Sequence, residues 1–561
     1  MRKLYFFLFL ISFAIILTVY NYHTPYSTTP ISDSPESSYQ FKIILIPLDS
    51  RPACTTFVAE LAKIADINVV LPPKEIMDNY KITADKHALR QWLYEESKDA
   101  NAAIISIDML VHGGLLASRQ SVGTQSDIDT VIHLLTSIHQ ERPQLPIYAF
   151  SIIPRLLIAD NTLTIQHQKN MMDYSVLKDQ IYTFENPVDI KKLEELEQQI
   201  PAEIINNYTM LYQQNMLQNM ALIKLVDKNV ITNLVIGQDD GQPFGLPNII
   251  KQRLYHYISL SDKLPDKVVL TRGTDEVALT ILGKIAAHLK HYQPKIFVAY
   301  SDENAPYTVM PYMPHSVATT VNEKIKLVDG VQVNTAEQAN FILFIHVGTQ
   351  KNQNSALPSA VTKIQTLLNQ GYQVALVDLS QDFTSQETVF PLLLRNNIEL
   401  TKLIAYAGWN TTSNSIGTAI TQATVFTATL PDKKTDPAIF NLYKTNLEFL
   451  TARFLDDWYY LKEVQPALNK ILKFVNIDPY HLGSYYGQTD AVVRRIMQYK
   501  SRQLLYSKAF KNPLTVTTQQ GAVSLAVTSL DIQTHLPWER TFEIYLRPSL
   551  TLSLVGSDQQ H

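Results

Sequence analysis

The sequence is poor in cysteine: Cys54 is the only one among its 561 residues. A single cysteine excludes an internal disulfide framework and any zinc site built from several cysteines. A lone cysteine near the end of an apolar run is more typical of a small buried side chain than of a nucleophile. The chain must therefore be stabilised by its hydrophobic core, and its composition, 46% hydrophobic and 18% charged, is that of a globular protein.

Several signatures of common enzyme classes are also missing. Without GxGxxG or GK[ST] a nucleotide cofactor is not indicated, and without HExxH or GxSxG the common zinc proteases and serine hydrolases are not indicated either. The net charge is −4 and the pI is near 6.4, with no compensating run of lysine and arginine, so we expect no binding to nucleic acid. We expect no organic cofactor, and a divalent metal stays an alternative.

The N-terminus carries an apolar run of its own. It extends from Leu4 to Tyr20 behind two cations, and it has the length of a secretory signal or a short membrane-spanning helix. No small-x-small cleavage signature follows it. We therefore predict a signal anchor at residues 1–20, a Ser/Thr/Pro-rich tether at residues 21–40 and an extracytoplasmic body held at the cell membrane. A cleaved signal peptide, and hence a secreted protein, is the alternative.

From Phe41 onward, short apolar runs alternate with amphipathic stretches, a pattern typical of βα units around a mainly parallel sheet. Most of the runs are continuous Val, Ile, Leu and Phe, as expected for strands that helices cover on both faces. The predicted fold class is α/β, with two Rossmann-like, mainly parallel lobes, then a helical segment and a small C-terminal β-element. The predicted strands are FKIILIPL, INVVLP, AAIISID, PIYAFSIIP, NLVIGQ, KVVLTR, KIFVAY, ANFILFIHV, QVALVDLS and KLIAYAG.

Changes of pattern along the chain predict its domain boundaries. A Glu-, Gln- and Leu-rich stretch indicates a helical excursion from the first lobe, and the alternating, Thr- and Val-rich tail indicates β-structure. We predict a first lobe at residues 41–292 with the excursion at 187–229, a second lobe at 293–435, a helical segment at 436–512 and the β-rich element at 513–561.

Polar side chains gather where the predicted strands end. In α/β folds, ligands bind outside the carboxyl ends of the strands, so we expect a shared site in a cleft between the strand ends of the two lobes. The candidates for catalysis are Asp49, Asp108, His112, Asp239 and Asp240, and the candidates for substrate binding are Arg51, Arg119, Arg155, Asp275, Glu276, Trp409, Asn410 and Asn414.

The types of these residues suit particular roles. Crowded carboxyl groups have to share protons, a metal or arginines, and in VIGQDDGQPFG one acid can face a ligand while its neighbour holds an arginine. His112 is an acid–base candidate because an imidazole titrates near neutral pH, and Trp409 is a candidate stacking platform. Each has a structural interpretation as well, since acids after strands often cap helices and a histidine can simply satisfy a turn.

The strand-end motifs stand in a fixed order along the chain: IPLDSRP, SIDMLVHGGLLASR, VIGQDDGQPFGLPN, GTDEVA, AYAGWNTTSNSIGTA and LPWERTFE. Taken together they resemble a bacterial family, the domain of unknown function 4127, over roughly Phe41 to Pro548. The N-terminal run and the tether lie outside the resemblance. The resemblance supports the candidate site residues and implies no particular reaction.

Three functions fit these features. The first is an extracytoplasmic hydrolase acting on a carbohydrate or cell-envelope glycan by carboxylate acid–base chemistry, most simply a glycosidase. The second is a divalent-metal-dependent hydrolase, and the third is a non-enzymatic solute-binding protein. We favour the first, because carboxyl, arginine, amide and aromatic side chains together suit a hydroxyl-rich substrate. The predicted partners are a small-molecule or glycan substrate and, through the N-terminal helix, the membrane.

Overall fold

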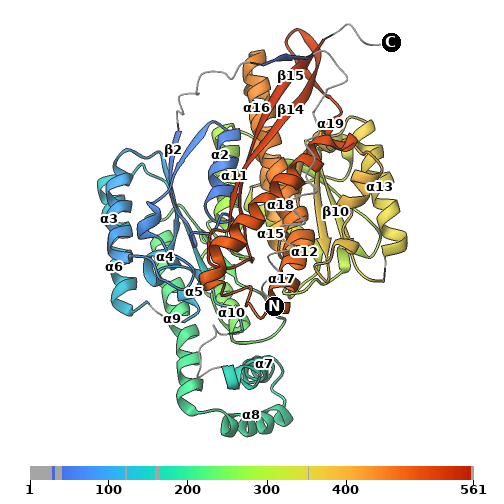
Figure 1. Cartoon of the computed structure of the whole chain (residues 1–561). Coiled ribbons are helices and arrows are strands. Elements are labelled where there is room, and N and C mark those ends of the chain that lie inside the picture. The colour runs from blue at the N-terminus through green and yellow to red at the C-terminus, as the bar shows by residue number, and fades with distance from the viewer. Residues whose placement is uncertain (1–27, 32–40, 121–122, 158–164, 352, 557–561) are drawn as a thin grey trace.

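The computed structural model describes residues 28–31, 41–120, 123–157, 165–351 and 353–556. These residues form two parallel sheets with alternating helices, a helical segment and a small antiparallel sheet (Figure 1), which confirms the predicted α/β class. The predicted signal anchor and most of the predicted tether lie outside the described residues. Of the helices that are described, none is long and apolar enough to cross a membrane.

The first lobe is built on a six-stranded parallel sheet with the strand order β3-β2-β4-β5-β6-β7. All six strands coincide with predicted apolar runs, and the central strands are buried because helices cover both faces of the sheet. The strands are β2 (Phe41–Ile46), β3 (Ile67–Val70), β4 (Ala102–Ser106), β5 (Ile147–Ile153), β6 (Asn233–Gln238) and β7 (Val268–Arg272). The helices that accompany them are α2 (Thr56–Ile64), α3 (Lys86–Glu96), α4 (Ile107–His112), α5 (Leu115–Ser118), α6 (Gln125–Glu141), α10 (Leu246–Ser259) and α11 (Val277–Leu289).

A group of three helices projects from the first lobe between β5 and β6 (Figure 1). They are α7 (Gln168–Phe184), α8 (Pro187–Gln199) and α9 (Ala202–Asp227). The excursion predicted at residues 187–229 corresponds to α8 and α9, and α7 precedes it.

The second lobe has a five-stranded parallel sheet with the order β12-β11-β10-β8-β9. Its strands are β8 (Lys295–Tyr300), β9 (Val331–Gln332), β10 (Phe341–Gly348), β11 (Val374–Ser380) and β12 (Leu403–Ala407), and its helices are α12 (Val317–Leu327), α13 (Gln353–Asn369), α14 (Phe390–Arg395) and α15 (Thr412–Thr429). Four of the five strands were predicted, and β9 is a short edge strand of two residues.

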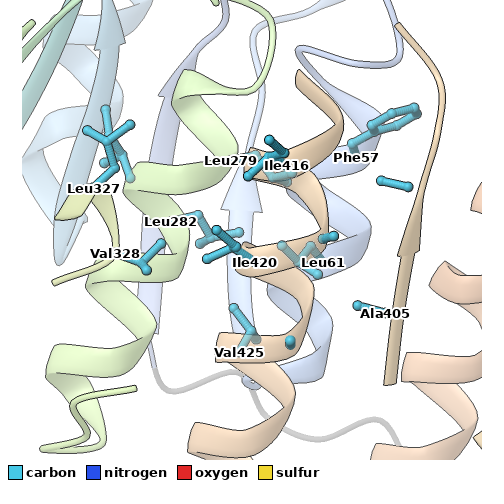
Figure 2. Close-up of a cluster of buried hydrophobic side chains, with 14 of the residues drawn as sticks. Phe57, Leu61, Leu279, Leu282, Leu327, Val328, Ala405, Ile416, Ile420 and Val425 are labelled. Atoms are coloured by element: carbon cyan, nitrogen blue, oxygen red, sulfur yellow. The ribbon is translucent and has the colours of Figure 1, made fainter. Parts of the chain in front are cut away.

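Helices from both lobes pack into one core. Figure 2 shows apolar side chains of α2, α11 and α15 meeting, among them Leu61, Leu282 and Ile420. α11 and α15 approach closely, because a Cβ on Gly283 would lie 2.7 Å from the Thr421 side chain. This shared core fixes the strand ends of one lobe relative to those of the other.

From Asp436 onward the chain is helical and then antiparallel. The helices are α16 (Asp436–Arg453), a π-helix (Phe454–Val464), α17 (Gln465–Phe474), α18 (Tyr486–Tyr506) and α19 (Lys508–Lys511). They are followed by β13 (Leu514–Thr518), β14 (Gly521–His535) and β15 (Tyr545–Val555), which form a sheet with β1 (Thr28–Pro30) from the predicted tether. The connection between β14 and β15 returns to the first lobe, where it helps to build the site.

Candidate active site

A cavity of about 750 Å³ lies at the carboxyl ends of the first sheet. Residues that follow β2, β4, β5, β6 and β7 line it, and the start of α15 contributes from the second lobe. Parallel strands bring their carboxyl ends to the same edge of a sheet, where α/β proteins bind ligands. The candidates from the sequence that line the cavity are Asp49, Arg51, Arg119, Arg155, Asp239, Asp240, Asp275, Asn410 and Asn414.

Arg51, which follows β2, joins two carboxylates. Its Nη2 lies 2.6 Å from Oδ2 of Asp49 and 2.8 Å from Oδ1 of Asp275, and its Nε also donates to Asp49 at 2.8 Å. All three side chains are buried. The amides of Asn410 and Asn414 lie 3.5 Å from Oδ2 of Asp275. One carboxylate therefore receives groups from both lobes.

The two adjacent acids after β6 have different surroundings. Asp239 is buried and accepts hydrogen bonds of 2.7 and 3.0 Å from Arg119, whereas Asp240 pairs with Arg155 at 3.1 Å and its side chain is 30% exposed. Burial opposes ionisation of Asp239, but the charge of Arg119 prevails and lowers its pKa. Burial and the charge of Asp239 raise the pKa of Asp240.

The backbone at Asp240 is strained. Its φ of 30° is positive, a conformation that is costly for a residue other than glycine and that occurs preferentially at functional sites. The strained residue is the more exposed of the two acids, and it lines the cavity.

Asp275 changes protonation near neutral pH. Burial raises its pKa to about 6, with the charge of Arg51 opposing the rise and that of Asp49 adding to it. The cavity thus holds a carboxyl group that gains a proton readily and, at Asp239, one that stays ionised. Carboxyl groups whose pKa values are pushed in opposite directions are the usual basis of acid–base catalysis in enzymes.

Two candidates for catalysis, Asp108 and His112, do not line the cavity, because α4 places both side chains in the interior of the first lobe. Oδ2 of Asp108 accepts the N–H of Ile152 at 2.9 Å, and burial raises the pKa of Asp108 to about 7. Nδ1 of His112 accepts the N–H of Gly123 at 2.9 Å, and burial lowers the pKa of His112 to about 4. Their contacts hold the backbone around the cavity, and we assign neither a part in the chemistry.

Two candidates for substrate binding also lie elsewhere, in the contact between the lobes. Oε1 of Glu276 is 2.5 Å from Nζ of Lys324, and both side chains are completely buried. Trp409 donates its indole N–H to Thr418 at 3.2 Å and packs edge-on against Phe57. Its ring is therefore part of the core and gives the cavity no stacking platform.

The aromatic wall of the cavity comes instead from the connection between β14 and β15, which sequence reasoning missed. The Arg540 guanidinium lies 4.6 Å from the ring centroids of both Tyr80 and Trp538, and Glu543 holds it with hydrogen bonds of 2.7 and 2.6 Å. Trp538 also donates to Ser50 at 3.0 Å. The LPWERTFE motif was the one available signal for this wall, and it carried no information about where the segment docks.

Asp49, Cys54 and Asp275 form a group of potential metal ligands, the one such group among the described residues, with ligand atoms within 4.8 Å of one another. However, the guanidinium of Arg51 already lies between the two carboxylates. Burial also raises the pKa of Cys54 well above its usual value, which disfavours the thiolate form that binds metals. The group fits a buried ion pair better than a metal centre.

The sequence profile of the family described as "Protein of unknown function (DUF4127)" matches residues 43–547. The chain belongs to this family. The DUF4127 match includes both lobes, the helical segment and every cavity residue named above. No curated protein matches the chain.

Proposed function

We propose that this DUF4127 protein is a hydrolase that cleaves a carbohydrate in the cavity by carboxylate acid–base chemistry. The observation that carries the proposal is the convergence, in one cavity at the strand ends, of several carboxyl groups with arginine, amide and aromatic side chains, among them Asp240, whose side chain is 30% exposed. The volume of about 750 Å³ lies within the usual range of ligand pockets. The N-terminal apolar run supports a location outside the cytoplasm, beside envelope glycans.

The balance of charge in the cavity favours a neutral, hydroxyl-rich substrate over a phosphate or another strong anion. Carboxyl groups and cations nearly offset each other, and each of the three arginines after the first-lobe strands is already paired with an aspartate. The ionisable side chains that line the cavity are Asp49, Asp78, Asp239, Asp240, Asp275 and Asp478, and Arg51, Lys81, Arg119, Arg155, Arg540 and His481.

Asp240 is the carboxylate that we assign to activating water or attacking the sugar carbon. Both acids line the cavity, but the Asp240 side chain is 30% exposed, whereas that of Asp239 is 5% exposed and held by Arg119. Asp275, with the amides of Asn410 and Asn414 beside it, is placed to bind hydroxyl groups. Hydrogen bonds to hydroxyl groups of the substrate are a general source of rate in glycoside hydrolysis.

The test is hydrolysis of a panel of nitrophenyl glycosides by the full chain. We expect turnover of at least one substrate, with kcat lowered about 10²–10⁴-fold in Asp240→Asn and with KM nearly unchanged. Asp262→Asn is the matched control, because Asp262 is exposed and precedes β7, at the opposite end of the sheet from the cavity.

Three results would count against the proposal. Turnover that survives in Asp240→Asn would exclude the assigned role, and loss of turnover on adding a chelator would favour the metal-dependent hydrolase. If the panel shows saturable binding and no turnover, the chain is a solute-binding protein.

A further inference from the structure

Asp78 is a cavity carboxyl group that the strand ends do not explain. It lies between a 3₁₀ turn (Lys74–Ile76) and α3, and the residue is 4% exposed. It lines the cavity, and its Oδ1 accepts the backbone N–H of Ser50 at 2.7 Å. The loop thus brings an additional buried acid to the carboxyl end of β2.

The two glycines after α4 make room for this acid. Gly114 has a φ of 126°, and a Cβ there would lie 3.1 Å from Oδ2 and 3.2 Å from Cγ of Asp78. Gly113 has a φ of 88°, and a Cβ there would come within 3.1 Å of the backbone of Ala84, in the same loop. Because Gly114 and Asp78 both line the cavity, the missing side chain leaves the space beside Oδ2 to the cavity.

A chain of hydrogen bonds fixes the orientation of Asp78. Trp538 donates its indole N–H to the Ser50 hydroxyl at 3.0 Å, and the backbone N–H of Ser50 donates to Oδ1 of Asp78 at 2.7 Å. The wall from the C-terminal connection therefore positions this carboxyl group as well as closing the cavity.

Burial and the charge of Asp49 favour a proton on Asp78. Asp49 forms an ion pair with Arg51, and it lies close enough to disfavour a second negative charge on Asp78. Burial, reinforced by Asp49, raises the pKa of Asp78 well above its usual value, while hydrogen bonding from Ser50 and the charge of Arg51 oppose the rise. Two neighbouring carboxyl groups of which one keeps its proton are a known way to hold an acid ready at neutral pH.

We propose that Asp78 is the general acid of this site, the group that donates a proton to the leaving oxygen of the substrate. The inference rests on the proposed function. The bond between the sugar carbon and the glycosidic oxygen breaks, its electron pair stays with the oxygen, and the oxygen takes the proton of Asp78. Water then adds to the sugar carbon and gives a proton to the Asp240 carboxylate. That proton leaves to solvent, and Asp78 takes one back.

The first test locates the proton without any substrate. Infrared spectra of the full chain in D₂O at neutral pH are compared with those of Asp78→Asn and Asp78→Glu. We expect the wild type to show a carboxylic acid band that Asp78→Asn lacks and Asp78→Glu retains, with circular dichroism confirming that each variant is folded. Identical spectra of wild type and Asp78→Asn in the carboxylic acid region would overturn the proposal.

The second test uses the dependence on the leaving group. A nitrophenolate leaves without being protonated, whereas the alcohol of a methyl glycoside or an oligosaccharide requires a proton. We expect Asp78→Asn to lose at least about 100-fold more kcat/KM on the alcohol substrates than on the matching nitrophenyl glycosides, and Asp78→Glu to recover part of that loss. The alkaline limb of the wild-type pH profile should also disappear in Asp78→Asn.

Equal losses on both classes of substrate would assign Asp78 a structural role and overturn the inference. If the wild type hydrolyses no glycoside although the infrared band is present, the proposed function is wrong, and so is the role of Asp78 as general acid. The conclusion that Asp78 carries a proton at neutral pH would still hold. The two failures are thereby distinguished.

Discussion

The buried pair between Lys324 and Glu276 provides a quantitative test of how the two lobes are held together. Lys324 belongs to α12 of the second lobe, and Glu276 follows β7 of the first, directly after the cavity residue Asp275. The lysine Nζ lies 2.5 Å from the glutamate and 2.9 Å from the hydroxyl of Thr271, and both charged side chains are 0% exposed. The perturbation is Lys324→Met, which keeps the bulk of the side chain and removes its charge.

The expected cost follows from the position of the glutamate. Once the lysine is gone, Glu276 is left as a buried carboxylate with the Ser413 hydroxyl, at 3.0 Å, as a remaining hydrogen-bond donor. Removing one member of a buried ion pair typically costs about 3–5 kcal/mol, because the other charge is left without compensation. Replacing both members by apolar residues of similar size is typically neutral or stabilising. We therefore expect Lys324→Met with Glu276→Leu to be much more stable than Lys324→Met alone.

The assay is urea denaturation of the full chain, followed by tryptophan fluorescence, for the two single variants and the double variant. Lys402→Met is the matched control, because Lys402 pairs with Glu399 at the same distance, 2.5 Å, but the two side chains are 32% and 29% exposed. An exposed pair contributes about 0–1 kcal/mol. The reasoning is refuted if Lys324→Met is no more destabilising than Lys402→Met, or if the second substitution at Glu276 lowers stability further.

Three further predictions concern single residues. Gly114→Ala should destabilise the fold by about 1–3 kcal/mol because its φ is positive, and by more because the new Cβ would contact Asp78. Gly371→Ala is the control, because Gly371 has a φ of 81° and nothing within 4 Å of the added Cβ, so it should show the backbone effect alone. Equal melting temperatures of the two variants would contradict this prediction. Burial raises the pKa of Asp108 to about 7, so between pH 4 and pH 8 the free energy of unfolding of the wild type should fall by about 4 kcal/mol relative to that of Asp108→Asn. If the difference between the two free energies does not change with pH, Asp108 is ionised in the folded chain. Trp538→Phe should cost about 0.5–1.5 kcal/mol and reduce turnover, while Trp409→Phe, which loses a similar indole hydrogen bond in the core, should cost as much stability and leave turnover intact.

The sign of the Asp108 prediction follows from its raised pKa. Below about pH 4 the carboxyl group is protonated in both the folded and the unfolded chain, so the full contribution to stability is present. As the pH rises towards 7, the unfolded chain gives up the proton while the folded chain keeps it, and stability falls. Asp108→Asn does not titrate, so it serves as the reference.

The fold could be predicted because its strands are covered on both faces. Such strands are continuous apolar runs, as in FILFIHVG of β10, and they stand out from the amphipathic helices between them. The convergence of polar residues at one edge is in turn a consequence of parallel strand direction, which is why Asp49, Asp239 and Asp275 could be expected to lie together. The short strand β9 has no such signature, and it was missed.

The direction of a side chain within a turn or short helix could not be predicted. Asp108 lies two residues after β4 and Asp239 one residue after β6, but Asp108 enters α4, whose turn directs its side chain into the lobe. Glu276 and Asp275 are adjacent in the sequence, and yet one faces Lys324 between the lobes while the other faces Arg51 in the cavity. The distance of a residue from a strand end predicts that it lies at that edge of the sheet, but it does not predict which way the side chain points.

Contacts between distant parts of the chain were equally out of reach. Trp538 meets Ser50 across 488 positions, because the connection between β14 and β15 folds back over the first lobe. Asp78 lies in the polar stretch KEIMDNYK, away from the end of any apolar run. Asp78 has no local signal for function, and the LPWERTFE motif that contains Trp538 does not indicate where its segment docks, since each residue belongs to the site only through tertiary packing.

The measurement that tests the central claim most directly is the melting temperature of the full chain against a panel of mono- and oligosaccharides, with a chelator and with added divalent metals. A ligand that binds the folded chain raises the melting temperature as the logarithm of its concentration over Kd, so weak binding also registers. The account predicts a rise with at least one sugar that the chelator does not abolish. A rise with metal alone, and none with any sugar, would contradict it.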